Sequence, residues 1–182
     1  MKIRSNYSLI EKFSSKTSNK IFFFILGVVL LSISSKISIP FYPVPMTLQT
    51  FVVYFIAASM GIIGFYSTVS YVFLGLIGLP IFASGGGIGY VFSPTFGFLY
   101  GMILASFLIS YLSKNMFDNS FLKILVAIFS SSLVIFICGI LHLSFYIGLQ
   151  KAISVGFVPF IYSELLKIAL AIFLTWMAIK KK

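Results

Sequence analysis

Long apolar segments restrict this chain to one class of structure. A helix that crosses a bilayer needs about 20 mainly apolar residues, and several segments approach that length, separated by short stretches rich in proline, glycine or lysine. Hydrophobic residues make up 60% of the 182 positions and charged residues only 9%, whereas a soluble domain carries about 25% charged residues. The chain has too little polar surface for a water-soluble enzyme, so we expect an all-α integral membrane protein.

The apolar segments predict six transmembrane helices. Pro40, Pro43 and Pro45 end the first helix, because proline is poorly accommodated inside a helix. The second and third helices are nearly continuous, so the turn between them near residues 61–64 must be tight. Merging or splitting one segment gives five or seven spans, and a cleaved signal peptide over residues 1–32 is an alternative to the first span. The six predicted spans cover residues 21–36, 47–63, 65–79, 93–113, 122–147 and 160–179.

Basic residues gather on one side of this topology. Five precede the first span, two lie between the fourth and fifth, and three follow the sixth, whereas only Lys36 and Lys151 lie in loops on the other side. Cytoplasmic loops are enriched in Lys and Arg, so both termini are predicted to be cytoplasmic. We expect a basic segment over residues 1–20, a domain in the cell membrane over 21–179 and a basic tail over 180–182. The net charge of +10 therefore reflects topology and not a nucleic-acid partner.

Two loops on the non-cytoplasmic side have unusual compositions. Residues 34–47 contain three prolines, which keep the backbone extended, and residues 85–89 contain four glycines. Both loops are also apolar, and non-helical backbone at membrane depth persists only where it is buried in protein or lines a cavity. We expect these structured loops to close over a cavity between the helices. The glycines either line a ligand or form a tight re-entrant turn.

One acidic residue is predicted at membrane depth. Glu164 lies near the start of the last span, and Lys167 follows three residues later on the same helix face. Charges within spans are costly and usually mark a function, so one interpretation is that the pair binds a polar ligand inside the bundle. The structural alternative is a helix start with Ser163 as its N-cap, an acid in the first turn and a lysine that reaches towards the interface.

Patterns typical of enzymes and metal sites are missing from the sequence. His142 is the only histidine and has no cysteine or acid at metal-ligand spacing. The sequence contains no HExxH motif, and no GxxxxGK[ST] motif that would bind ATP. Gly97, Gly101 and Ala105 form a small-residue stripe that is typical of helix packing. We therefore expect neither an enzyme nor a resident cofactor or metal.

Three ordered motifs resemble the BioY family, the biotin-specific substrate-binding (S) components of energy-coupling-factor (ECF) transporters. Residues 43–50 (PVPMTLQT) resemble its PVPxTxQT signature, and residues 78–98 resemble its GLPVFAGGGG and GPTGGY segments. Residues 159–167 resemble its PFLPGDLLK segment, although Tyr-Ser-Glu at 162–164 stands where the family has Pro-Gly-Asp. The similarity covers about residues 27–179.

The resemblance implies capture of biotin on the outer side of the membrane, in a pocket that both loops close. It implies that Lys167 binds the carboxylate of biotin and Glu164 its ureido ring, or the reverse. The other pocket residues that it implies are Tyr90, Gly86, Gly87, Thr47, Gln49 and Thr95.

The resemblance also implies partners, because the chain itself encodes no energy source. These are a transmembrane coupling protein and two ABC-type ATPases, with membrane lipids around the helices. Uptake by this chain alone, as a homo-oligomer, is the alternative mechanism. Two other functions stay open, namely an S component for another vitamin and an intramembrane enzyme or assembly factor.

Overall fold

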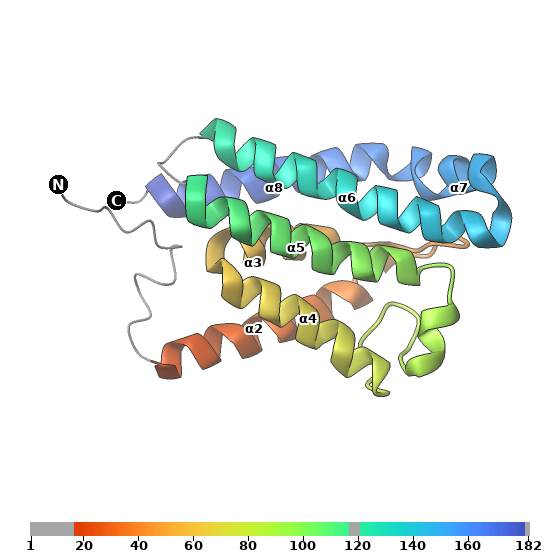
Figure 1. The fold of residues 1–182 in the computed structure, drawn as a ribbon, viewed down its shortest axis with the longest axis horizontal. Coiled ribbons are helices and arrows are strands. Elements are labelled where there is room, and N and C mark those ends of the chain that lie inside the picture. Colours follow the sequence, from red (N-terminus) through yellow and green to blue (C-terminus); the bar gives the residue numbers. More distant parts are fainter. Residues whose placement is uncertain (1–16, 117–120, 181–182) are drawn as a thin grey trace.

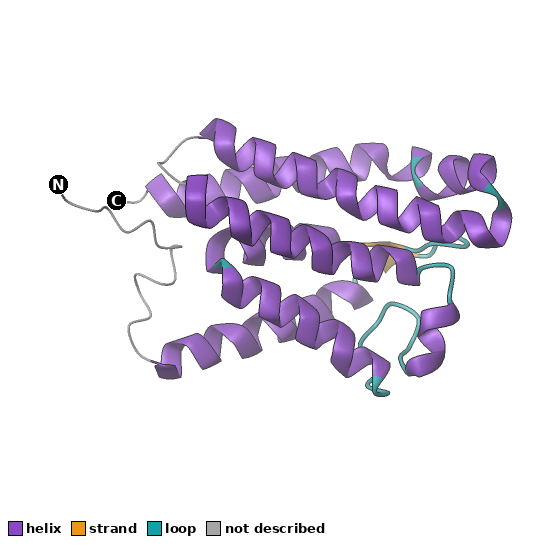
Figure 2. Ribbon diagram, in the orientation of Figure 1, coloured by secondary structure: helices purple, strands orange, loops and turns teal. Residues whose placement is uncertain are grey.

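The computed structural model describes residues 17–116 and 121–180, which form a bundle of helices (Figures 1 and 2). A short antiparallel ribbon and two 3-10 helices connect the longer elements. In chain order the elements are α2 (Thr17–Lys36), β1 (Ser38–Ile39), β2 (Met46–Thr47), α3 (Gln49–Met60), α4 (Ile62–Leu76), η1 (Ile88–Phe92), α5 (Phe96–Met116), α6 (Phe121–Ile147), α7 (Leu149–Gly156), η2 (Val158–Phe160) and α8 (Ile161–Lys180).

Apolar helices dominate the described part of the chain. Three stretches are long and apolar enough to cross a membrane, and three further helices are apolar but shorter. The long stretches are Thr17–Lys36, Phe121–Ile147 and Leu149–Ala178, and the shorter helices are Gln49–Met60, Ile62–Leu76 and Phe96–Leu112. This mostly helical, apolar architecture agrees with the predicted class of all-α membrane protein.

Each predicted span coincides with a helix, but the sequence analysis missed α7. The largest difference in boundary is at α2, which begins at Thr17 and not at residue 21. α7 has only eight residues and is amphipathic, with Ala152 and Gly156 buried while Lys151 is exposed. A helix this short has too few apolar residues to resemble a span, so its residues were expected to form a loop.

α3 and α4 are joined by a tight turn at Gly61, as predicted. Gly61 has a φ of 58°, which favours glycine, and its carbonyl accepts a 2.8 Å hydrogen bond from Ser110 Oγ on α5. Gly64 lies against the Ile56 carbonyl, so a Cβ at this position would meet the backbone of α3. The two helices are therefore in backbone contact beside their turn.

The small-residue stripe of α5 packs against α6, as predicted. A Cβ on Gly97 would collide with His142 and the Cys138 carbonyl, and one on Gly101 would press on Cys138 and Ile135. The absence of side chains lets the two helix backbones approach closely. This close packing against α6 therefore holds the start of α5 in place.

The main apolar core contains buried residues of α2, α3, α4, α5, α6 and α8. Its fully buried side chains include Tyr54 of α3, Tyr71 of α4 and Leu31 of α2. Ser67 of α4 donates a 3.0 Å hydrogen bond to the Phe24 carbonyl of α2. α2 is therefore an integral part of the bundle.

The two ends of the bundle contain different elements (Figure 1). α2 and α6 begin, and α8 ends, at the end drawn on the left. The loop residues 37–48 and 77–95, together with α7, lie towards the opposite end. Both proline- and glycine-rich loops thus share one end of the bundle, where their side chains can contribute to a common site.

Candidate ligand-binding cavity

A cavity lies between the helices beneath these two loops. Its empty volume is about 560 Å³, a figure that includes the open space at its mouth. The lining residues are Val44, Pro45 and Thr47 from the first loop, Ala83, Tyr90 and Thr95 from the second, and Gln49, Thr50, Phe98, Leu99, Met102, Ile135, Phe136, Phe160, Glu164 and Lys167 from the helices. Both loops therefore form part of its wall.

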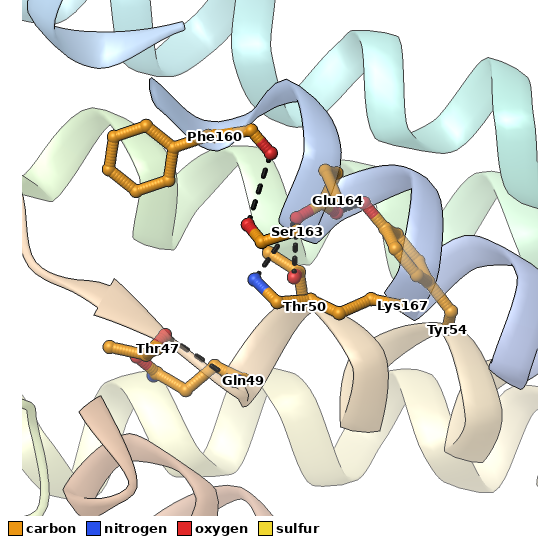
Figure 3. Close-up of polar contacts among 8 residues, drawn as sticks. All are labelled: Thr47, Gln49, Thr50, Tyr54, Phe160, Ser163, Glu164 and Lys167. Carbon is orange, nitrogen blue, oxygen red and sulfur yellow. Dashed lines mark hydrogen bonds and ion pairs between the residues drawn. The ribbon is translucent and has the colours of Figure 1, made fainter. Parts of the chain in front are cut away.

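A hydrogen-bonded acid–base cluster forms one part of the wall (Figure 3). The Glu164 carboxylate accepts hydrogen bonds from Tyr54 Oη at 2.6 Å and from Thr50 Oγ1 at 3.0 Å. Lys167 Nζ donates to the same carboxylate at 3.2 Å. Thr50 and Tyr54 lie one turn apart on α3, and both reach Glu164 on α8, so the cluster joins the two helices.

The two charges in this cluster are almost completely buried. Glu164 is 4% exposed and Lys167 is 7% exposed, a placement that is tolerated only when charges are paired and hydrogen-bonded. Glu164 also lies in the first turn of α8, where the helix dipole favours a negative charge. The Lys167 ammonium has three N–H donors, and its described contacts use one of them. The wall therefore offers a ligand both a cationic donor and a carboxylate acceptor.

Apolar side chains form most of the remaining wall. Phe136 of α6 lies between Phe98 and Phe160, with ring centroids 6.3 Å and 6.5 Å away. Leu99 and Met102 of α5 extend this apolar surface. A cavity with a few convergent polar groups in an apolar surround suits a ligand with a polar end and an apolar body.

Gln49 connects the cavity to the second loop. Its Nε2 donates a 2.8 Å hydrogen bond to Tyr71 Oη, and Tyr71 in turn donates to the Ile81 carbonyl at 3.0 Å. The Gln49 backbone N–H donates to Thr47 Oγ1 at 3.3 Å. Both side chains that the first motif implied, Thr47 and Gln49, therefore line the cavity, and Tyr71 sets the orientation of the Gln49 amide.

Tyr90 and Thr95 bring the second loop into the cavity wall. Thr95 Oγ1 donates a 3.2 Å hydrogen bond to Tyr90 Oη and lies 3.1 Å from Ser93 Oγ. The Tyr90 ring packs on Phe82 with centroids 4.7 Å apart, and Phe82 is fully buried. These contacts link the two cavity residues that the second motif implied.

Gly86 and Gly87 lie outside the cavity lining. A Cβ on Gly86 would collide with the Leu79 carbonyl, and the Gly87 N–H donates a 2.7 Å hydrogen bond to the Gly75 carbonyl of α4. Gly87 also has a φ of +103°, which favours glycine. The structure therefore places both glycines in the fold of the loop against the end of α4.

The prediction of Ser163 as a helix N-cap is wrong. α8 begins at Ile161, two residues earlier, and Ser163 Oγ donates to the Phe160 carbonyl at 3.1 Å. Tyr162 is 85% exposed and is not part of the lining. Of the three residues that depart from the family motif, only Glu164 reaches the cavity.

Sequence reasoning missed Thr50 and Tyr54, the partners of the acid. Thr50 is the last residue of the first motif and Tyr54 follows four residues later, which places both on one face of α3 and was a usable signal. The sequence could not show that this face meets Glu164, because the contacts join residues 114 and 110 positions apart.

A second cavity lies between α6 and α8. Its volume is about 470 Å³ with the open space at its mouth, and it shares Phe136 and Glu164 with the first cavity. Leu133 and Leu165 line it and are about half exposed, at 45% and 51%. This groove opens on an apolar outer face and lacks the lysine, so the first cavity is the better candidate for a polar ligand. Within the described ranges, no group of three His, Cys, Asp or Glu residues could hold a metal ion.

Comparison with known proteins agrees with this architecture. The BioY family model matches residues 7–181 of the chain. The fold is similar to a crystal structure of the S-component for biotin from an ECF-type ABC transporter, with a TM-score of 0.82 and 21% identity over 93% of this chain and 94% of that chain.

Two relatives are similar over most of their own length. The biotin transporter BioY of Thermotoga maritima is 40% identical over 145 residues, which cover 78% of this chain and 85% of the relative. The probable biotin transporter BioY of Pyrococcus horikoshii is 35% identical over 149 residues, which cover 81% of this chain and 88% of the relative. Because the family model covers nearly the whole chain and these relatives align with it so extensively, the chain belongs to the BioY family.

Proposed function

We propose that this chain captures biotin and is the substrate-binding component of a membrane uptake system. The observation that carries the proposal is the buried Glu164–Lys167 pair in the wall of a largely apolar cavity. The names of the relatives as biotin transporters, and the similar fold of an S component for biotin, support the choice of ligand. A protein of this kind binds and releases its ligand unchanged and needs no catalytic group.

The spacing of the charged pair restricts how biotin is bound. Lys167 Nζ and Glu164 Oε2 are 3.2 Å apart, so both contact the same end of a ligand unless the pair separates. The ureido ring of biotin has two N–H donors and one carbonyl acceptor, which complement a carboxylate and an ammonium placed side by side. A ligand carboxylate at this position would face Glu164 with like charge. We therefore favour the ureido ring at both residues over Lys167 at the carboxylate end.

The remaining cavity residues complete this arrangement. Gln49 lines the cavity with an amide that Tyr71 orients, and it supplies a further polar contact. Thr47, Tyr90 and Thr95 form the wall that the loops provide, and the apolar side chains enclose the fused ring and aliphatic chain of biotin. Gly86 and Gly87 act indirectly in this proposal, by allowing the second loop to fold against α4.

We infer a topology of six spans with both termini in the cytoplasm. Lys20 and Lys123 lie in the first turns of α2 and α6, at the end opposite the two loops, whereas Lys36 and Lys151 lie towards the loop end. In the sequence, most other basic residues precede α2 or lie near the end of α5 or of α8, which favours cytoplasmic placement of this first end. The predicted basic segments over residues 1–20 and 180–182 lie largely outside the described residues. The cavity then opens to the outside of the cell membrane.

In our proposal, import requires partner proteins in addition to this chain. A transmembrane coupling protein and two ABC-type ATPases would supply the energy, as the ECF context of the similar solved structure suggests. Uptake by this chain alone, as a homo-oligomer, is the competing mechanism. Neither mechanism involves nucleic acid or a bound cofactor.

Equilibrium binding of labelled biotin to the detergent-purified protein tests the proposed ligand. We expect saturable binding that unlabelled biotin displaces and that thiamine and riboflavin do not. Displacement by another vitamin but not by biotin would identify an S component of different specificity. A folded protein that binds none of these compounds would refute the proposal. Conversion of any bound compound would indicate an enzyme.

A further inference from the structure

Two side chains of α6 bond to the second loop at the point where it enters the cavity wall. His142 Nε2 lies 3.1 Å from the Ser93 carbonyl, and Tyr146 Oη donates a 2.8 Å hydrogen bond to the Phe92 carbonyl. A carbonyl oxygen only accepts, so His142 donates from a protonated Nε2. The two side chains are four residues apart and share one face of α6.

The His142 ring is partly buried and has three aromatic neighbours. Its centroid lies 6.1 Å from that of Phe96, 5.9 Å from that of Tyr100 and 5.5 Å from that of Tyr146. Gly97 allows the backbone of α5 to lie directly against the Cβ of His142. The donor at residue 142 is therefore positioned by the close packing of α5 on α6.

The bonded carbonyls adjoin Tyr90 and Thr95, two of the three second-loop residues that line the cavity. The Ser93 N–H donates a 2.9 Å hydrogen bond to the Tyr90 carbonyl, and Ser93 Oγ lies 3.1 Å from Thr95 Oγ1. Thr95 in turn donates to Tyr90 Oη. A displacement of Phe92 and Ser93 would therefore move both Tyr90 and Thr95.

We propose that His142 and Tyr146 are positioning residues for the ligand, which keep Tyr90 and Thr95 in place in the cavity wall. This inference rests on the proposed function in biotin binding. Neither side chain lines the cavity, so both act through the loop. Two hydrogen bonds from a packed helix reduce the ordering cost that a mobile wall would impose on binding.

The test compares biotin affinity in Tyr146→Phe, His142→Phe and His142→Gln with that of the unmodified chain. Each Phe variant removes one hydrogen bond, and we expect binding about threefold to tenfold weaker, mainly through faster dissociation. His142→Gln retains an N–H donor and should recover part of the loss. Tyr66→Phe is the matched control, because Tyr66 is 55% exposed, similar to Tyr146 at 46%, and lies outside the cavity.

Hydrogen exchange in residues 88–95 provides a second measurement that does not depend on biotin. We expect faster exchange in both Phe variants without ligand, while Tyr66→Phe stays like the unmodified chain. Unchanged exchange would show that the two bonds do not restrain the loop, and faster exchange with unchanged affinity would show that the restraint does not serve binding. Either result overturns the inference. If the unmodified chain binds no biotin, the proposed function fails, whatever the exchange shows.

Discussion

At the scale of single residues, Glu164 has two roles that a mutation can separate. It is the counter-ion of Lys167 and also the acceptor for two hydroxyl groups of α3. Removing one partner of a buried ion pair leaves an uncompensated charge, whereas removing both can be nearly neutral. The same side chain therefore contributes to stability and, in our proposal, to ligand recognition.

We predict that Glu164→Gln lowers stability because it leaves the Lys167 ammonium buried without a counter-ion. The expected loss is about 3–5 kcal/mol, typical for breaking a buried pair. The double variant Glu164→Gln/Lys167→Met should regain much of this loss and still fail to bind biotin. Thermal unfolding in detergent, with and without biotin, measures both effects. A double variant as unstable as the single one would contradict the pairing argument.

Replacing Lys167 by alanine should weaken biotin binding by about 2–5 kcal/mol, because a desolvated charged hydrogen bond is lost. Lys151→Ala is the control, since Lys151 is an exposed lysine of α7. Comparing biotin with its methyl ester in both proteins then locates the ligand carboxylate. If Lys167 contacts the ureido ring, esterification has the same effect with and without Lys167. An ester effect that disappears in Lys167→Ala would place the carboxylate at Lys167 instead.

At the scale of secondary-structure elements, close backbone contacts decide how the short helices pack. α3 has only 12 residues, which corresponds to about 18 Å at 1.5 Å per residue. That length is less than the hydrocarbon thickness of about 30 Å. The hydrogen bonds between β1 and β2 pair part of the non-helical backbone that precedes α3. Such pairing is what allows non-helical chain inside a membrane bundle.

Gly64→Ala should destabilise the protein, because the new methyl group would meet backbone atoms of Ile56 and Ala57 that cannot move aside. We expect a loss of about 1–3 kcal/mol, the usual cost of overpacking. Gly89→Ala is the matched control, since a Cβ there has no neighbour within 4 Å. A comparison of thermal midpoints checks this. Equal midpoints for the two variants would argue against the tight α3–α4 contact.

At the scale of the whole molecule, where the ligand binds and what drives its import are separate questions. The cavity is contained within one chain and includes residues from both loops and from α3, α5, α6 and α8. In our proposed topology, a polar ligand bound there still has to leave towards the opposite end, past the buried core beneath the cavity. Movement of the whole chain or of its helices is therefore needed for import.

We predict that cells with this chain import labelled biotin faster when the coupling protein and both ATPases are also present. In our proposal, ATP hydrolysis by the partners drives the movement that a ligand-binding chain cannot drive alone. Cells with the Lys167→Ala variant and all partners should import at the background rate, which controls for uptake by other routes. Equal import with and without the ATPases would favour uptake by this chain alone.

The helical architecture was largely predictable because its signals are local. Hydropathy marked every long helix, and glycine and proline marked the turn at Gly61 and the two loops. The i, i+3 spacing was sufficient to bring Glu164 and Lys167 together, since both lie on one turn of α8. α7 was missed because eight amphipathic residues carry little hydropathy signal.

The composition of the cavity wall depended on tertiary packing. Thr50 and Tyr54 meet Glu164 only because α3 lies beside α8 in one particular register. Gly86 and Gly87 fold against α4, whereas Tyr90 and Thr95 of the same loop line the cavity. Composition and periodicity are local properties of the sequence. They were therefore sufficient to predict the class of protein, its helices and its charged pair. The contacts between distant helices depend on how side chains interlock across the bundle, and only the folded structure could assign them.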